Sequence, residues 1–103
     1  MKELETPTNR LAKACAHSNS PELWEEFVRR SAPVVSLVAA RVTRLWTGRI
    51  TSAVVDDIVQ EVFLKLCERD RRILREFVPQ GDESFVGLLR VVSTSVANDH
   101  FRR

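Results

Sequence analysis

The 103-residue chain has the size of a single domain and is long enough to bury a hydrophobic core without disulfide or metal support. Its formal net charge of +2, from 16 basic and 14 acidic residues, is too small to indicate a nucleic-acid partner by itself. Three glycines, four prolines and no tyrosine, among many Leu, Val, Ala, Arg and Glu residues, predict an all-α fold.

Several classes of protein are disfavoured by what the sequence lacks. Cys15 and Cys67 match no metal-ligand spacing, which is typical of two reduced thiols. No apolar run approaches the roughly 20 residues of a membrane span, and "MKELETPTNR" has no apolar segment of a secretory signal. We therefore expect a cytoplasmic protein without a membrane partner. No phosphate loop, metal cluster or nucleophile motif is present, so we expect no enzyme and no cofactor.

Residues 1–19 are predicted to form an N-terminal extension with one short helix near residues 10–17, and residues 20–103 to form the main domain. A long helix is expected after Ser20, which can cap it, with Pro21 in its first turn. Pro33 is expected to break or kink this helix because it has no backbone N–H. Gly48 is its expected C-terminal cap. Its apolar positions are Leu23, Phe27, Val28, Val34, Val35, Leu37, Val38, Val42, Leu45 and Trp46.

A further helix is expected from about residue 53 to beyond residue 69, capped by Thr51 or Ser52. The segment 77–84 is predicted to be a loop. A last helix is expected to begin at about residues 82–84 and to continue to Arg103. A helix that continues to the last residue indicates a fragment or a domain separated from its partner. The whole is predicted to be a compact bundle of about four helices. The stripes expected to be buried are Val55, Ile58, Val59, Val62, Phe63, Leu66 and Cys67, then Phe85, Leu88, Leu89, Val92 and Val96.

The third of these segments has a second, polar face. By pattern alone this is a solvated surface, with Glu61 and Lys65 as an i,i+4 ion pair. Two features favour a surface that binds another helix. Leu64 lies in the middle of this face, and Gln60 occupies a position where a solvated face more often carries a charged residue. The residues that share this face are Asp57, Gln60, Glu61, Leu64 and Lys65.

Two segments resemble region 2 of bacterial RNA polymerase sigma factors, especially the extracytoplasmic-function group. The family pattern Asp-x-x-Gln-Glu-x-Phe is matched in "VVDDIVQEVFLKL". A second pattern, Phe-x-x-Trp-Leu followed by an aliphatic residue and Asp-His-x-Arg-Arg, is similar to "SFVGLLRVVSTSVANDHFRR". The family's Trp and Asn are replaced by Leu88 and Ser95. The matching residues are Asp57, Gln60, Glu61 and Phe63, then Phe85, Leu89, Val92, Asp99, His100, Arg102 and Arg103.

The resemblance implies a transcription initiation domain with a helical fold. Its partners would be core RNA polymerase, through the clamp helices of the largest subunit, and the minus-ten element of promoter DNA; an anti-sigma factor is a further candidate. It implies that the polymerase-facing positions are Asp57, Gln60 and Glu61, with Leu64 and Lys65 beside them.

For DNA, the resemblance points to the last helix and the loop before it. Arg90, Thr94, Asn98 and Arg102 are four residues apart and share one edge, where they suit phosphate and base contacts or form a plain solvent face. Arg103 follows them. Phe77 either stacks on an unpaired base or belongs to the core.

A helical protein-interaction module without promoter activity is the alternative function. It is favoured by Ser95, because the amide donor and acceptor of the family's Asn are lost, and by the lack of a second, helix-turn-helix domain in this sequence.

Overall fold

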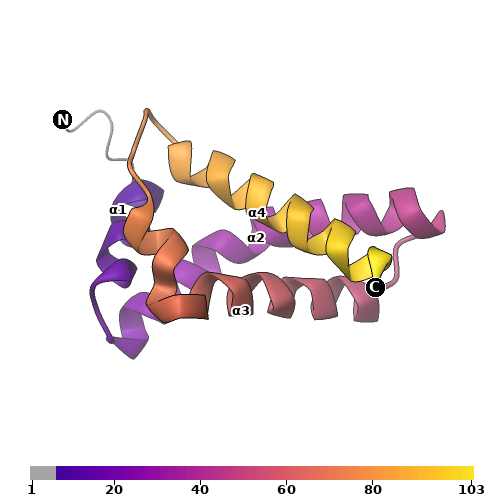
Figure 1. Ribbon diagram of the computed structural model, residues 1–103, viewed down its shortest axis with the longest axis horizontal. Coiled ribbons are helices and arrows are strands. Elements are labelled where there is room, and N and C mark those ends of the chain that lie inside the picture. The colour runs from indigo at the N-terminus through magenta and orange to yellow at the C-terminus, as the bar shows by residue number, and fades with distance from the viewer. Residues whose placement is uncertain (1–6) are drawn as a thin grey trace.

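The computed structural model describes residues 7–103, which form four helices and no strand (Figure 1). This confirms the predicted all-α bundle. The helices are α1 (Pro7–Ala16), α2 (Pro21–Thr47), α3 (Ser52–Glu76) and α4 (Ser84–Arg102). Within these described residues no helix is both long enough and apolar enough to cross a bilayer.

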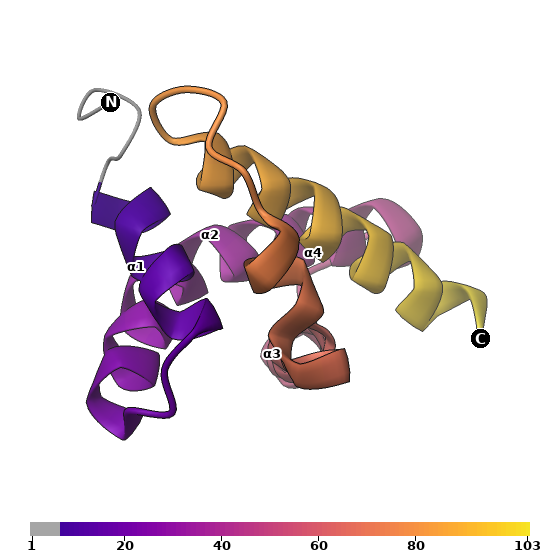
Figure 2. The ribbon, with the colours of Figure 1, turned by 60° about the vertical axis from the view of Figure 1, so that its left-hand side comes forward.

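The three long helices lie side by side, and α1 crosses the end of the bundle where α2 begins (Figures 1 and 2). α2 and α4 run in the same direction, and α3 runs in the opposite direction (Figure 1). The short turn at residues 48–51 forces α3 to reverse along α2, whereas residues 77–83 give the chain length to pass over to α4. α1 packs against all three other helices.

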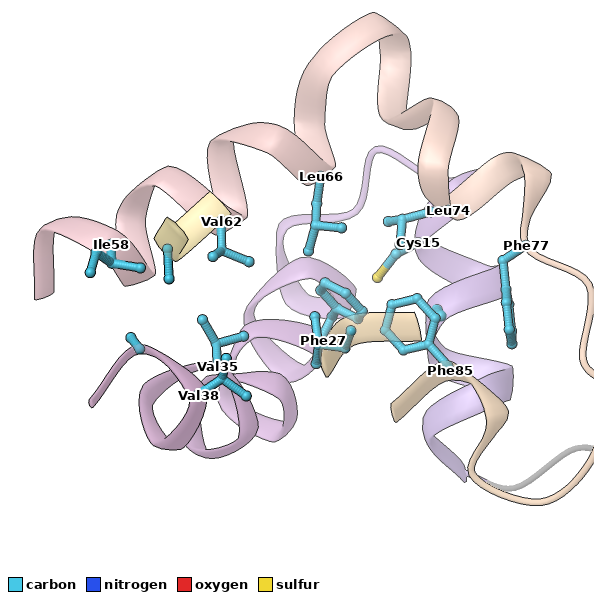
Figure 3. Close-up of a cluster of buried hydrophobic side chains, with 14 of the residues drawn as sticks. Cys15, Phe27, Val35, Val38, Ile58, Val62, Leu66, Leu74, Phe77 and Phe85 are labelled. Carbon is cyan, nitrogen blue, oxygen red and sulfur yellow. The ribbon is translucent and has the colours of Figure 1, made fainter. Parts of the chain in front are cut away.

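The core centres on Phe27 of α2 (Figure 3). Its ring centroid lies 5.6 Å from that of Phe85, which in turn lies 5.2 Å from Phe77. The fully buried Ile58 and Val62 of α3 point toward the α2 side of this cluster (Figure 3). The apolar stripe predicted for the third segment is therefore the surface that holds α3 against α2.

Some residues predicted to be apolar contacts are exposed instead. Leu37, Leu45 and Trp46 of α2 are 60%, 79% and 48% exposed, and Cys67 is also exposed. Small side chains are buried in α2 and α4, which pack against each other. The small residues buried in these two helices are Ser31, Ala39, Thr43, Ser93 and Ala97.

α2 begins and ends as predicted but is not broken. The Ser20 hydroxyl accepts a hydrogen bond from the Leu23 N–H (3.3 Å), and Gly48 closes the helix in a left-handed conformation with φ 82°. Pro33 lies inside one continuous helix, so of the two expected effects, a break or a kink, the break is wrong. Packing of the helix on both sides of Pro33 outweighs the loss of one backbone hydrogen bond.

α3 has an interruption that the sequence did not reveal. Arg69, Asp70 and Arg71 all have left-handed backbones, with φ of 52°, 56° and 58°, a conformation that costs about 1–2 kcal/mol for each non-glycine residue. The Arg71 guanidinium offsets this cost: it donates hydrogen bonds to the carbonyl oxygens of Cys15 (2.7 Å) and Ser18 (2.9 Å). It also lies 4.4 Å above the Trp24 ring.

α1 is part of the core although it lies in the predicted extension; residues 1–6 of that extension are outside the described residues. Asn9 is fully buried and joins α1 to the start of α4. Its amide donates to the Gly81 carbonyl (3.1 Å), and its oxygen accepts from the Phe85 N–H (2.9 Å). An amide group of one helix thus caps the first turn of another.

Because Arg71 ties α3 to the α1–α2 connection, Arg71→Ala should lower the free energy of unfolding by about 2 kcal/mol. The neighbouring Arg72 makes only a surface ion pair with Glu76 at 2.8 Å, so Arg72→Ala should change it by at most about 0.5 kcal/mol. Chemical denaturation followed by circular dichroism measures both values. Equal losses in the two variants would contradict this role for Arg71.

Candidate docking and nucleic-acid surfaces

The outer face of α3 presents most of the predicted docking residues to solvent. Asp57, Gln60, Leu64 and Lys65 are exposed, and Leu64 keeps 67% of its surface accessible. They lie opposite the buried stripe because a helix places residues three and four apart on one side. The structure therefore brings these four residues together as a continuous surface.

An apolar groove runs beside this surface, between α2 and α3. It has a volume of about 500 Å³. Gln60 and Leu64 form its α3 rim, and the half-buried rings of Trp24 and Phe63 lie along it. The remaining lining residues are Val28, Ala32, Val59 and Cys67. The sequence pattern assigned four of the lining residues to the core, because it does not show which apolar positions at a helix boundary remain partly exposed: Val28, Val59, Phe63 and Cys67.

Glu61 differs from the other four, because its carboxylate is bonded within the chain. One oxygen lies 2.8 Å from His100 Nδ1 and the other accepts a hydrogen bond from Arg103 at 2.7 Å. An ionised carboxylate only accepts, so Nδ1 must carry the proton that it shares with Glu61. Nδ1 then cannot accept from Arg103, which lies 3.2 Å away. We refer to these three residues as the carboxylate latch.

The latch also sets the acidity of Glu61. Its partial burial acts to raise the pKa of the carboxyl group, but the hydrogen bonds from His100 and Arg103 outweigh this and hold the pKa below its ordinary value of 4.5. Glu61 is thus a charged group that fastens the end of α4 to the middle of α3. The sequence motifs identified all three residues but not that they meet.

The predicted i,i+4 pair of Glu61 and Lys65 is not formed. The Lys65 ammonium lies 3.4 Å from Glu68 instead, and both side chains are more than half exposed. Because Glu61 is held by α4, Lys65 turns toward the next carboxylate along its own helix. Exposed pairs of this kind contribute at most about 1 kcal/mol.

The predicted DNA-contacting residues of α4 have different environments. Arg90 and Thr94 are exposed, and Arg102 is exposed with Asp99 at 3.6 Å. Asn98 is half-buried, and its oxygen accepts a hydrogen bond from Trp46 Nε1 at 2.8 Å. Asn98 therefore positions a neighbouring ring, and its amide N–H groups remain able to donate to another partner.

Phe77 is not available for base stacking. Only 7% of its surface is exposed, and its ring meets Phe85 edge to face. Phe77 was expected either to stack on a base or to belong to the core. The structure places it in the core, so its assignment to DNA binding is wrong. The reason is its position directly after α3, where the chain turns inward toward α1 and α4: its backbone carbonyl accepts a hydrogen bond from the Lys13 ammonium at 2.9 Å.

The two departures from the family pattern occupy different sites. Leu88, at the family's Trp, is half-buried against the core, where a smaller apolar side chain is accommodated. Ser95, at the family's Asn, is exposed and lines a concavity together with Glu61 and Leu64. Ser95 is thus on the side of α4 that faces the docking surface.

Removing the charge of Glu61 should loosen the latch. We expect Glu61→Gln to lower the free energy of unfolding by about 1 kcal/mol at pH 7, because two charge-assisted hydrogen bonds are weakened at a partly exposed site. The folded pKa of Glu61 lies below 4.5, so its contribution is complete above that value and is lost as pH falls through the folded pKa. The difference between wild type and Glu61→Gln should therefore vanish in acid.

Asp57→Asn provides the matched control, because Asp57 lies one turn away on the same helix and makes no ion pair with any of residues 7–103. Urea denaturation at several pH values measures both variants. A loss in Glu61→Gln that is the same at pH 7 and in acid would contradict the latch.

The comparisons with known proteins add no assignment. No protein-family model, no curated protein and no solved structure matches this chain.

Proposed function

We propose that the chain is a transcription initiation domain that docks on core RNA polymerase through the outer face of α3 and contacts promoter DNA through α4. The observation that carries the proposal is the exposed line of Asp57, Gln60 and Leu64 on a helix whose opposite side is buried. These residues fall on the motif that resembles sigma factor region 2, and the fold is the helical bundle that the resemblance implies.

The chemistry of this face suits a basic helical partner. The Asp57 carboxylate can form charge-assisted hydrogen bonds with Arg or Lys, and the Gln60 amide can both donate and accept. Leu64 offers an apolar anchor at the rim of the α2–α3 groove, which can receive an apolar side chain of the partner. A few polar groups around an apolar centre are typical of the central part of a protein interface.

Glu61 has a different role in this proposal. Its carboxylate serves the carboxylate latch, so it contributes to docking by holding α3 and α4 together beneath the interface. A substitution of Glu61 would disturb the fold as well as the surface. The docking test is therefore built on its exposed neighbours.

The alternative function, a protein-interaction module without promoter activity, is supported by two observations. Phe77 is buried, and Ser95 lacks the amide of the family's Asn. Both remove groups that the resemblance assigns to base recognition. Arg90, Thr94 and Arg102 remain exposed on α4, so these three groups, which could contact a DNA backbone, do not distinguish the two functions.

The double variant Gln60→Ala/Leu64→Ala should weaken binding to purified core RNA polymerase by about 10–100-fold, because central interface residues often contribute 1–2 kcal/mol or more each. Its helicity should be unchanged, since both side chains are exposed. Biolayer interferometry with immobilised protein measures the affinity, and circular dichroism checks the fold.

The double variant Val78→Ala/Gln80→Ala is the matched control, because it removes one amide and one exposed apolar side chain from the loop before α4. It should bind core polymerase as the wild type does. Wild-type affinity of the α3 variant would refute docking through this face. Run-off transcription with core polymerase separates the two functions: polymerase binding without transcripts would favour the interaction module.

A further inference from the structure

The carboxylate latch has two arms of different strength. In the His100 arm, Glu61 Oε2 lies 2.8 Å from His100 Nδ1, and the two side chains are only 29% and 23% exposed. In the Arg103 arm, Glu61 Oε1 accepts a hydrogen bond from Arg103 at 2.7 Å, but the Arg103 side chain is 65% exposed. Water competes for an exposed cation and screens its charge, so the Arg103 arm is the weaker of the two.

The Arg103 arm is also a limited contact. Only one guanidinium nitrogen reaches Glu61, whereas the strongest pairs of arginine and carboxylate use two parallel hydrogen bonds. The same nitrogen lies 3.2 Å from His100 Nδ1, which already donates to Glu61 and has no lone pair to offer. Within residues 7–103, Glu61 is the one residue with which Arg103 forms an ion pair. The long Arg103 side chain can therefore turn away into solvent once another cation takes its place.

Release of Arg103 would leave α4 in its position. The His100 arm would still join Glu61 to the last turns of this helix. From the α2 side, the Trp46 Nε1–H donates to the Asn98 oxygen at 2.8 Å and holds the same part of α4. The change on release is therefore local: Oε1 of Glu61 becomes open to a donor from outside the chain.

Arg103 and the proposed docking surface share a concavity between α3 and α4. It has a volume of about 340 Å³ and is lined by Glu61, Leu64 and Arg103. Leu64 is also the apolar anchor at the rim of the α2–α3 groove. A partner that packs on Leu64 and extends toward α4 therefore meets Arg103 where it covers Glu61. The other residues that line the concavity are Lys65, Glu68, Ser95, Val96 and Asp99.

The pairing of Glu61 differs from that of the two other carboxylates in this concavity. Its cation, Arg103, comes from 42 positions away in the chain, at the end of another helix. A pair within one helix forms wherever that helix forms, because its residues are fixed neighbours. Arg103 instead reaches Glu61 from outside α3, as a basic side chain of a partner would. The other two carboxylates pair within their own helices, Glu68 with Lys65 and Asp99 with Arg102.

We propose that Arg103 is an internal competitor of the docking partner: it occupies the Glu61 oxygen to which a basic side chain of the partner binds, and docking displaces it. The inference rests on the proposed function and adds a restraint on the same surface. During the exchange the His100 arm keeps α3 and α4 joined. A contact within the chain that covers a binding group reduces the apparent affinity in proportion to the fraction of molecules in which that group is free.

The docking test compares wild type and Arg103→Ala for binding to purified core RNA polymerase by biolayer interferometry. Arg103→Ala should bind about fivefold more tightly, because a surface ion pair that must open before docking is removed. Arg103→Lys keeps a cation at this position and should bind as the wild type does. If Arg103 only supported the fold, its removal would weaken binding, which is the opposite result. Circular dichroism checks that the helicity of each variant is unchanged.

Arg29→Ala is the matched control for the loss of one positive charge. The Arg29 side chain is 70% exposed and pairs with Glu26 at 2.6 Å. Glu26 keeps a second partner in Arg30, as Glu61 keeps one in His100. Both variants thus remove one exposed arginine from a carboxylate that retains another partner. Arg29→Ala should bind core RNA polymerase as the wild type does, and equal tightening in the two variants would overturn the inference.

The Arg103 arm can also be measured without polymerase. Partial burial raises the pKa of the Glu61 carboxyl group, and hydrogen bonds from His100 and Arg103 outweigh this and lower it. Arg103→Ala removes one of these hydrogen bonds, so the pKa of Glu61 should rise in an NMR titration of its carboxyl carbon. Arg29→Ala should leave it unchanged. A Glu61 pKa that is the same in wild type and Arg103→Ala would overturn the inference.

A double-mutant cycle with Glu61→Gln assigns the effect to this pair of residues. In the Glu61→Gln background, Arg103→Ala should not change the affinity for polymerase. Tighter binding that persists there, or equal affinity of wild type and Arg103→Ala, would overturn the competition while docking through α3 stands. If neither wild type nor Arg103→Ala binds polymerase, the docking is overturned and the competition with it.

Discussion

Packing of the apolar stripe of α3 against α2 determines what the rest of the molecule can present. Val55, Ile58, Val62 and Leu66 are directed inward toward the cluster around Phe27. When one side of a helix is buried, the residues on its opposite side face solvent, because the 3.6-residue period determines the direction of every side chain. The exposed line on the opposite side, with Leu64 at its centre, is therefore a consequence of how the core is filled.

Three polar side chains then determine the position of each helix along its neighbours. Asn9 joins α1 to the first turn of α4, Arg71 joins α3 to the α1–α2 connection, and Glu61 joins α3 to the last turn of α4. Each forms hydrogen bonds to residues more than 35 positions away in the chain. Hydrophobic packing is not directional, so polar contacts of this kind select one register of the helices among several of similar apolar burial.

The charged residues divide the surface into two parts. The outer face of α3 carries the acidic and amide groups of Asp57 and Gln60. Arg41 of α2 and Arg90 of α4 line one concavity, and the segment 27–55, which contains Arg41, Arg44 and Arg49, has no Asp or Glu. The net charge of +2 does not reveal this division, because it sums 16 basic and 14 acidic residues over the whole chain. In the proposed function, the face of α3 would meet a basic protein partner and the arginines would meet the DNA backbone.

The carboxylate latch connects the two faces. Asn98 and Phe101, which position Trp46, lie on the same turns of α4 as His100, which bonds Glu61. The end of α4 is thereby fixed from both sides, by α2 through the indole and by α3 through the carboxylate. A partner that displaced His100 or Arg103 from Glu61 would loosen the support of the Trp46 ring.

The sequence by itself determined the helices, their approximate bounds, the caps at Ser20 and Gly48, and the stripe of α3 that is buried. These features depend on local periodicity and on backbone chemistry, which are written in neighbouring residues. Only the tertiary structure decided that α2 continues through Pro33, that α3 is interrupted at Arg69, that Phe77 lies in the core and that Glu61 is bonded to α4. Each of these depends on groups far apart in the chain, whose free energy of contact exceeds the local preference, and no local pattern records such contacts.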